Sequence, residues 1–249
     1  MLKEERQKTI MREINLHNRV LSADLCNLLN VSDDTVRRDL KDLADSGKII
    51  KIHGGAMSKS FVSTFETQDE VYAVQAKRQI AAKTLSLFKR NMVVLTEGGT
   101  TILEFAKMIP EKLPATVFTI SPQVAITLSA HSNLEVITIG GKLNKNANLH
   151  TGSSVLNQLS EIKVDLCLLG ANALSVQDGL TDVDWEVVQV KKALIRAARK
   201  VAVLSISEKL NTAQRLKICD LNQIHYLVTE LSPESHFLAP FRNNDLQLI

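Results

Sequence analysis

The segment from Val31 to Ala56, VSDDTVRRDLKDLADSGKIIKIHGGA, constrains the fold of this chain more than any other part of the sequence. Ser32 is suited to cap a helix, because its hydroxyl can accept a hydrogen bond from a free amide of the first turn. Apolar side chains then recur at the spacing of a buried helical stripe, at Val36, Leu40 and Leu43. The sequence therefore predicts an amphipathic helix that turns Arg37 and Arg38 outward.

By itself, such a charged face is also consistent with a solvated surface helix, and the neighbouring segments favour a more specific interpretation. Upstream, residues 6–17 and 22–29 each carry the apolar spacing of a helix. Downstream, Gly47 is suited to end the helix, and the run from Lys48 to Ile52 alternates as a strand does before a Gly-Gly turn. Three helices followed by a two-stranded wing predict a winged helix-turn-helix domain over residues 1–57, with the helix-turn-helix itself at about residues 20–39.

A domain of this kind predicts binding to double-stranded operator DNA. Arginine can make two hydrogen bonds to a guanine edge, whereas lysines and hydroxyls can contact phosphates. The candidate DNA-binding residues on the helix and the wing are Ser32, Thr35, Arg37, Arg38, Lys41, Lys48, Lys51 and His53. We expect the acidic residues Asp39, Asp42 and Asp45 to point off this face or to pair with Arg37 and Lys41.

The composition indicates an ordinary globular protein of two domains, since 45% of the 249 residues are hydrophobic and 23% are charged. Because the sequence contains neither a long apolar run nor the apolar core of a signal peptide, we expect a cytoplasmic protein that does not associate with membranes. The three cysteines and six histidines are not spaced as ligands, so we expect free thiols and neither a metal ion nor another cofactor. The net charge of +3 is too small to indicate nucleic-acid binding by itself.

After a polar stretch at residues 58–75, which reads as a linker, the sequence predicts an α/β domain over residues 76–249. Short apolar runs alternate there with helical stretches, and the runs are Met92–Thr96, Thr116–Ile120, Leu134–Ile139, Val164–Leu169, Val201–Ile206 and Ile224–Thr229. This alternation predicts a mainly parallel sheet covered on both faces. We expect a last short strand at residues 246–249.

In such sheets, ligands bind beyond the carboxyl ends of the strands, so the loops that follow the strands hold the candidate effector-binding residues. After the first strand, Glu97, Gly98, Gly99, Thr100 and Thr101 lead into a helix, whose free amides attract an anion such as phosphate. The candidates after later strands are Ser121, Gly140, Gly141, Lys142, Asp178 and Lys209. Each has a structural alternative as a turn, a helix cap or a surface lysine, and the sequence leaves these alternatives open.

Both halves of the chain resemble the DeoR family of bacterial regulators. The matching residues are Arg6, Ile10, Val31-Ser32, Thr35–Leu40, Leu43, Gly47, His53–Ala56, Lys77–Ala81, Gly99–Thr101, Gly140-Gly141, Leu169–Ala171, Gly179–Thr181 and Lys209. The resemblance implies a winged helix-turn-helix repressor, or less often an activator, of a carbohydrate-use operon. It also implies a second domain similar to ribose-5-phosphate isomerase and the CoA transferases, which holds a phosphorylated sugar or a related metabolite.

These observations predict a DNA-binding regulator without catalytic residues, whose α/β domain senses a metabolite and forms the oligomer. We expect a homodimer or homotetramer, because helix-turn-helix proteins commonly read half-sites roughly 34 to 36 Å apart. The alternative from another class is a phosphosugar isomerase or acyl-transfer enzyme, but Asn172, Ala173 and Ile206 stand where such an enzyme needs carboxylates. An adaptor that binds DNA without a small ligand is the third interpretation.

Overall fold

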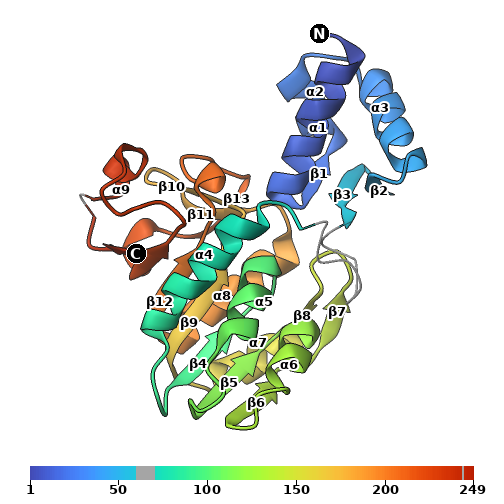
Figure 1. The fold of residues 1–249 in the computed structure, drawn as a ribbon. Coiled ribbons are helices and arrows are strands. Elements are labelled where there is room, and N and C mark those ends of the chain that lie inside the picture. Colours follow the sequence, from blue (N-terminus) through green and yellow to red (C-terminus); the bar gives the residue numbers. More distant parts are fainter. Residues whose placement is uncertain (60–70, 243) are drawn as a thin grey trace. The chain divides into compact units, whose positions relative to one another are not determined.

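The computed structural model describes residues 1–59, 71–242 and 244–249 (Figure 1). The chain divides into two compact units, Met1–Tyr72 and Ala73–Ile249. Most of the segment interpreted as a linker, residues 58–75, lies outside the described ranges. At its edges, Ser58 still belongs to a strand of the first unit, and the first helix of the second unit begins at Val74.

The first unit has the winged helix-turn-helix arrangement that the sequence predicts. Its elements are α1 Lys3–His17, β1 Arg19–Leu21, α2 Ser22–Leu29, α3 Asp33–Asp45, β2 Ile49–Ile52 and β3 Gly55–Ser58. Ser32 caps α3 by accepting a hydrogen bond from the amide of Thr35 (3.4 Å). Asn30, at the turn between α2 and α3, is left-handed (φ 50°), and Gly47 after α3 has φ 71°. The helix-turn-helix and the wing are therefore set by local sequence signals.

A strand that the sequence did not indicate, β1, completes the wing. The three strands pair in the order β1-β3-β2, with Leu21 opposite Gly55. A Cβ atom on Gly55 would lie 2.0 Å from the carbonyl oxygen of Val20, so β1 can approach β3 only where the side chain is absent. The second glycine of the His53–Ala56 motif is thus required by packing, whereas Gly54 supplies the left-handed turn (φ 74°).

The second unit is built on a seven-stranded sheet in which every pairing is parallel. In the order β15-β14-β12-β9-β4-β5-β6, its strands are Gln247–Leu248, Tyr226–Val228, Ala198–Leu204, Val164–Gly170, Val93–Thr96, Ala115–Thr119 and Leu134–Thr138. Each coincides with one of the apolar runs in the sequence. The prediction of a mainly parallel sheet is confirmed.

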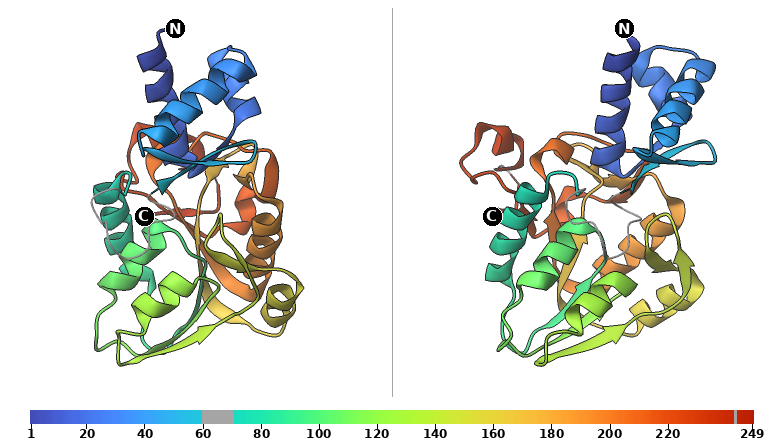
Figure 2. Two further views of the ribbon diagram at one scale, coloured as in Figure 1. Left: turned by 90° about the vertical axis from the view of Figure 1, so that its right-hand side faces the viewer. Right: turned by 45° about the vertical axis from the view of Figure 1, so that its right-hand side comes forward.

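Helices cover both faces of this sheet (Figures 1 and 2). One layer consists of α4 Val74–Thr84, α5 Thr100–Met108 and α6 Pro122–Leu128, and the other of α7 Ser153–Ser160 and α8 Trp185–Ala197. Short helical turns at Leu85–Leu87, Ser207–Lys209, Leu221–Gln223 and His236–Leu238 and a last short helix, α9 Ala239–Arg242, complete the unit. The core between the sheet and the second layer includes Leu95, Cys167, Leu169, Leu194 and Val203.

Smaller sheets occupy segments where the sequence predicts a loop or indicates no strand. The polar sequence of residues 143–151 predicts a loop, but the structure has a hairpin of β7 Lys142–Asn144 and β8 Leu149–Thr151. A further antiparallel sheet consists of β10 Ala173–Ser175, β11 Gly179–Asp182 and β13 Leu216–Cys219. The sequence pattern predicts a helix from about Asp184 to Lys200, but α8 ends at Ala197, because β12 already begins at Ala198. The first residues of β12 are partly or fully exposed and include two charged side chains, so the apolar run Val201–Ile206 does not include them.

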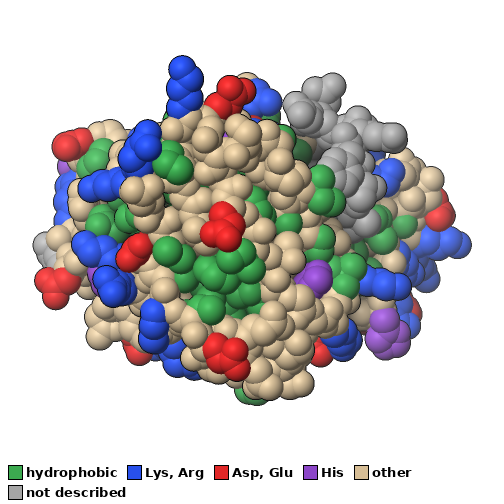
Figure 3. Space-filling model, turned by 90° about the horizontal axis from the view of Figure 1, so that it is seen from below, with side chains coloured by type: hydrophobic (Ala, Val, Ile, Leu, Met, Phe, Trp, Pro, Cys, Tyr) green, Lys and Arg blue, Asp and Glu red, His purple; other side chains and the backbone are tan. Residues whose placement is uncertain are grey.

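Seen from below, apolar side chains gather near the centre of the molecule's face, with acidic side chains beside them and basic ones towards the edge (Figure 3). In the described ranges, we find no helix long and apolar enough to cross a bilayer.

Candidate functional site

In the first unit, the outward face of α3 and the wing present the residues predicted to contact DNA. Ser32, Arg37, Arg38, Lys41, Lys48, Lys51 and His53 are exposed, and Thr35 is half-buried with its hydroxyl 3.0 Å from that of Ser32. Arg37 makes an ion pair with Asp33 one turn earlier (2.7 Å), which leaves both side chains largely in solvent. The arrangement can offer several cations and hydroxyls to one groove of a duplex.

Of the acidic residues predicted to point off the DNA-binding face or to pair with Arg37 and Lys41, Asp39 and Asp42 pair instead with residues of α1. Asp39 turns inward, is 1% exposed and accepts two hydrogen bonds from the Arg6 guanidinium of α1, one of them 3.2 Å long from Nη2. One turn further along α3, Asp42 pairs with Lys3 of α1 (2.7 Å). Two ion pairs therefore join α1 to α3, the helix that presents Arg38.

In the second unit, the strand order has a topological switch point beside β4. From β4 the chain proceeds through β5 and β6 towards one edge of the sheet, and the later strands β9, β12, β14 and β15 fill the other side. Ligands of open α/β sheets bind at such a switch point, outside the carboxyl ends of the strands. Glu97 follows β4, and Gly170 ends the neighbouring β9.

The loop between β4 and α5 contains two glycines, one packed tightly against its neighbours and one beside open space. A Cβ atom on Gly98 would lie 2.9 Å from the hydroxyl of Ser121, which is itself buried and caps α6. Gly99 precedes α5 with φ 94°, and a Cβ atom there would meet no heavy atom within 4 Å. The backbone at Gly99 thus faces open space where α5 begins with Thr100 and Thr101, so an anion can approach the free amides of this helix.

A buried cluster of charged side chains lies beside this loop. The ammonium of Lys191 on α8 is 3.4 Å from Oε2 of Glu97 and 3.2 Å from Oδ2 of Asp182, and it donates to the carbonyl oxygen of Gly170 (3.0 Å). The three charged residues are 4%, 6% and 6% exposed, respectively. Asn172 donates to the other oxygen of Asp182 (3.0 Å). The cluster therefore joins the ends of β4, β9 and β11 through one helix.

Burial and mutual attraction oppose each other within this cluster. Desolvation raises the pKa of Glu97 to about 7, although Lys191 acts against the shift. Burial alone would raise the pKa of Asp182, but Lys191, Asn172 and the amide of Val183 more than offset it, so this pKa is lowered. Burial alone would lower the pKa of Lys191, but the two carboxylates raise it overall. Lys191 and Asp182 are thus the firmly ionised pair, and Glu97 titrates near neutrality.

Two further lysines lie near the same cluster. Lys209 donates to the carbonyl oxygen of Ala171 (3.0 Å), and desolvation together with the charges of Lys77 and Lys191 lowers its pKa to about 7. Lys77, on α4, is 6% exposed, and desolvation lowers its pKa to about 8 despite the nearby carboxylate of Glu104. The buried ammonium of Lys209 is costly unless an anion compensates its charge, which makes this edge of the sheet a candidate anion site.

The remaining sequence candidates lie further out. The amide of Gly141 donates to Nδ1 of His150 (2.9 Å), and exposed Lys142 pairs with Glu186 (3.1 Å). Gly140 accepts through its carbonyl oxygen from Gln158 of α7 (2.8 Å). Asp178 is exposed at the turn between β10 and β11, where it accepts from the hydroxyl of Ser175 (2.8 Å). These contacts fit the structural alternative of each residue.

Sequence reasoning missed Lys77, Asp182 and Lys191. The spacing of Val187, Val190, Leu194 and Ala198 predicts a buried stripe on α8 that leaves Lys191 off it, and this prediction is wrong, because Lys191 is 4% exposed. A signal was present, since Lys191 follows Val187 by four residues and precedes Leu194 by three, which places it on the buried stripe. Likewise, Asn172 looked like a lost carboxylate, whereas the structure supplies that charge from Asp182.

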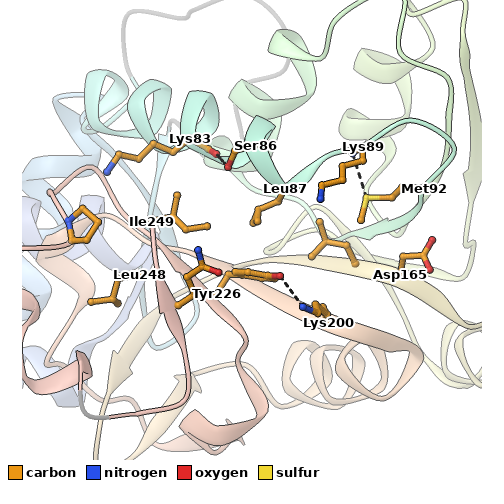
Figure 4. Close-up of a pocket in the computed structure, with 13 residues that line it drawn as sticks. Lys83, Ser86, Leu87, Lys89, Met92, Asp165, Lys200, Tyr226, Leu248 and Ile249 are labelled. Atoms are coloured by element: carbon orange, nitrogen blue, oxygen red, sulfur yellow. Dashed lines mark hydrogen bonds between the residues drawn. The ribbon is translucent and has the colours of Figure 1, made fainter.

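A separate cavity of about 700 Å³ lies at the opposite end of the strands, beneath the end of α4 (Figure 4). Two of the three lysines in its lining are engaged within the protein, because Lys83 donates to the carbonyl oxygens of Thr229 (2.8 Å) and Leu231 (2.7 Å), and Lys200 donates to the hydroxyl of Tyr226 (3.0 Å). The third lysine of the lining is Lys89. Within the described part of the chain, no group of three or more His, Cys, Asp or Glu side chains is placed to hold a metal ion.

Protein-family models match both units. Residues 6–61 match the DeoR-like helix-turn-helix domain, and residues 72–231 match the DeoR C terminal sensor domain. The HTH-type transcriptional repressor GlcR of Bacillus subtilis is 32% identical over 256 residues, which cover 100% of this chain and 96% of that protein. The HTH-type transcriptional regulator GlpR of Haloferax volcanii is 31% identical, over 92% of this chain and 91% of its own. A glycerol-3-phosphate regulon repressor of Haemophilus influenzae is 26% identical over 92% of this chain and 90% of its own.

Among solved structures, the chain is similar to a translation initiation factor eIF-2B of Pyrococcus horikoshii, with a TM-score of 0.45 and 15% identity over 90% of this chain and 88% of that one. It is also similar to ribose 5-phosphate isomerase A of Methanocaldococcus jannaschii, with a TM-score of 0.40 and 18% identity over 54% of this chain and 53% of that one. The relatives identified by sequence are transcription regulators, so the enzyme alternative is dropped. The chain belongs to the DeoR family of DNA-binding transcription regulators, with a helix-turn-helix domain followed by a sensor domain.

Proposed function

We propose that this regulator represses a carbohydrate-use operon and is released from its operator when a phosphorylated sugar or a related metabolite binds to the sensor domain. The observation that carries the proposal is the group of buried cations at the carboxyl ends of the strands, beside the open backbone of Gly99. A related repressor, of the glycerol-3-phosphate regulon, is named for a phosphorylated small molecule, which supports the same ligand chemistry.

The DNA-binding part of the proposal assigns base contacts to the outward face of α3 and phosphate contacts to the wing. Arg38 is exposed and makes no ion pair within the described residues, so its guanidinium can approach a base pair without breaking one. Lys48 and Lys51 flank the wing and suit the sugar-phosphate backbone.

The effector part assigns the ligand to Glu97–Thr101, Ser121, Lys209 and the added residues Lys77 and Lys191. Binding must favour one arrangement of the protein over another, and couplings of this kind are typically about 1 to 3 kcal/mol. We therefore expect a saturating effector to weaken operator binding by roughly 5- to 150-fold.

The test is a fluorescence-anisotropy titration of the full chain against the DNA upstream of its own gene, with and without a panel of phosphorylated sugars and glycerol 3-phosphate. We expect one compound to weaken binding and its unphosphorylated parent to have no effect. If no compound changes the affinity, the protein is an adaptor without a small ligand and the sensing part of the proposal is wrong.

Two pairs of variants assign the effect to the proposed sites. Arg38→Ala should weaken operator binding by about 1 to 3 kcal/mol, whereas Arg90→Ala, an exposed arginine of the sensor unit, should not. Lys209→Met should abolish the effector response, whereas Lys192→Met, at a half-buried lysine beside Lys191, should retain it. Equal effects within either pair would contradict the assignment of that site.

The same proposal includes a homodimer or homotetramer in the cytoplasm. One helix-turn-helix covers a single half-site, so tight binding requires a second copy at a separation of roughly 34 to 36 Å. Light scattering coupled to gel filtration measures the oligomer directly, and a monomer that binds the full operator tightly would contradict this part of the proposal.

A further inference from the structure

The cavity of about 700 Å³ at the amino ends of the strands lies apart from the effector site proposed at their carboxyl ends (Figure 4). Its lining comes from the end of α4, from the turn that follows this helix, and from residues near the beginning of β9, β12, β14 and β15. Its volume falls within the range of about 300 to 1,000 Å³ that is usual for small-molecule sites. We propose that this cavity is a second ligand site of the sensor domain, which binds an organic monocarboxylate with an apolar body.

The polar part of the lining offers hydrogen-bond donors to an anion. The ammonium of Lys200 donates to the hydroxyl of Tyr226 (3.0 Å) and lies 5.3 Å from the centre of its ring, so this hydroxyl keeps its own proton for another acceptor. Within the described ranges, the side chain of Lys89 makes no hydrogen bond or ion pair, and its ammonium lies among the lining residues in Figure 4. A carboxylate in the cavity could therefore accept from Lys89 with one oxygen and from Tyr226 or Lys200 with the other.

The carboxylate of Asp165, which also lines the cavity, is engaged with other groups. Its Oδ2 accepts a hydrogen bond from the amide of Val93 (3.0 Å), and its Oδ1 lies 3.8 Å from the guanidinium of Arg199. In the part of the chain that the structure describes, neither Lys89 nor Lys200 forms an ion pair with a carboxylate. An incoming anion would thus meet two ammonium groups without first breaking an ion pair.

The end of α4 and the apolar walls favour one kind of anion over another. The last carbonyl groups of a helix carry partial negative charge, which disfavours a dianion such as a phosphate monoester beside the end of α4. At the strand ends, in contrast, the beginning of α5 favours such a group. Apolar side chains from separate elements complete the cavity, at Leu87, Met92, Leu166 and Leu248. A monocarboxylate with a hydrocarbon body matches both the charge and the walls.

The experiment uses the full chain with ¹³C-labelled methionine methyl groups, because Met92 lines the cavity and the four other methionines serve as references. Met92→Leu assigns the Met92 signal. The probes are butyrate, hexanoate and octanoate, with octan-1-ol as the uncharged control and glycerol 3-phosphate as the phosphorylated one. Lys89→Met, Lys200→Met and Tyr226→Phe each remove one donor, and Lys145→Met, at an exposed lysine between β7 and β8, is the matched control.

We expect octanoate to shift the Met92 signal while the other four methionine signals stay in place. The affinity should rise from butyrate to octanoate by up to about fourfold for each added methylene group. Octan-1-ol should bind at least about tenfold more weakly than octanoate, because it lacks the charged acceptor. Lys89→Met and Lys200→Met should each weaken octanoate binding by a similar factor without lowering the melting temperature, since both lysines are exposed, and Lys145→Met should leave it unchanged.

Equal affinity for octanoate and octan-1-ol, or unchanged octanoate binding in both lysine variants, would overturn the inference, since the cations would then not hold the ligand. A Met92 shift caused by glycerol 3-phosphate and abolished by Lys89→Met would show that the cavity takes phosphorylated ligands instead. A Met92 signal that depends on protein concentration would place a second copy of the chain in the cavity, and no shift with any carboxylate would leave it without the proposed ligand; either result overturns the inference. The effector site at the strand ends is tested separately, through operator binding.

Discussion

The ion pair between Asp39 and Arg6 predicts a large effect of a single substitution on the DNA-binding unit. The side chain of Asp39 is 2% exposed and that of Arg6 13% exposed. Asp39→Ala would leave the largely buried guanidinium of Arg6 without its carboxylate, and removing one partner of a buried pair costs about 3 to 5 kcal/mol. Because the edge of Arg6 still reaches water, we expect the low end of this range, about 3 kcal/mol.

That loss is large for a unit of this size. At about 0.05 to 0.15 kcal/mol per residue, the unit Met1–Tyr72 has a free energy of unfolding of roughly 4 to 11 kcal/mol. A loss of about 3 kcal/mol should lower its melting temperature by roughly 12 to 24 °C. Differential scanning calorimetry of the full chain should show the transition of the first unit moving down while that of the second stays in place.

Asp42→Ala is the matched control, because it removes the neighbouring ion pair between the same two helices. The side chains of Asp42 and Lys3 are 46% and 61% exposed, so water replaces the lost contact and the transition should move little. If Asp39→Ala and Asp42→Ala lower the melting temperature of the first unit equally, or if neither changes it, burial does not make the Asp39 ion pair more stabilising than the exposed one, and the reasoning is refuted.

Three further predictions concern the wing and the sensor domain. Gly55→Ala should destabilise the first unit by roughly 2 to 3 kcal/mol in urea unfolding, since β1 must move away from β3, and Gly54→Ala, which meets no atom within 4 Å, should cost about 1 kcal/mol; equal costs would refute the close-approach argument. Lys51→Ala should reduce the slope of log K against log salt by about 0.9 for any duplex, whereas an unchanged slope would remove Lys51 from the phosphate contacts. Burial raises the pKa of Glu97 in the folded protein to about 7, so its contribution to stability is complete below the pKa of the unfolded state and is lost as the pH rises through 7. Glu97→Gln should therefore flatten the decline in the free energy of unfolding between pH 5 and 7. Parallel curves for the wild type and the variant would contradict this.

The first unit could be predicted closely because its signals are local. The cap at Ser32, the left-handed Asn30 and the glycine after α3 each act through neighbouring residues, and the structure confirms all three. The strand β1 was not predicted, since three residues carry too short a pattern and their pairing partner, Gly55, lies more than thirty positions away. Likewise, the ion pair between Arg6 and Asp39 joins two helices that the sequence does not place side by side.

The sensor domain shows the same limit. Its apolar strands were predicted because a strand buried on both faces is apolar throughout, whatever its neighbours are. The sequence indicated only part of the charge cluster, because the two carboxylates that pair with the buried Lys191 lie at the ends of β4 and β11, far from it in the sequence. Glu97 and Lys209 were found from their places after strands, whereas Lys77 precedes the first strand and lay outside that rule. Residues of the cluster that lie on helices could not be found by looking only at strand ends.

The helix that carries Lys191 also begins with the single tryptophan of the chain, Trp185, which is 64% exposed. Its indole therefore sits less than two helical turns from the charge cluster, yet remains in water. The protein has in effect an intrinsic optical label on the part of the sensor that holds the cluster together, without a competing tryptophan elsewhere. Changes at α8 can be followed by the emission of the unmodified protein at the low concentrations that operator binding requires.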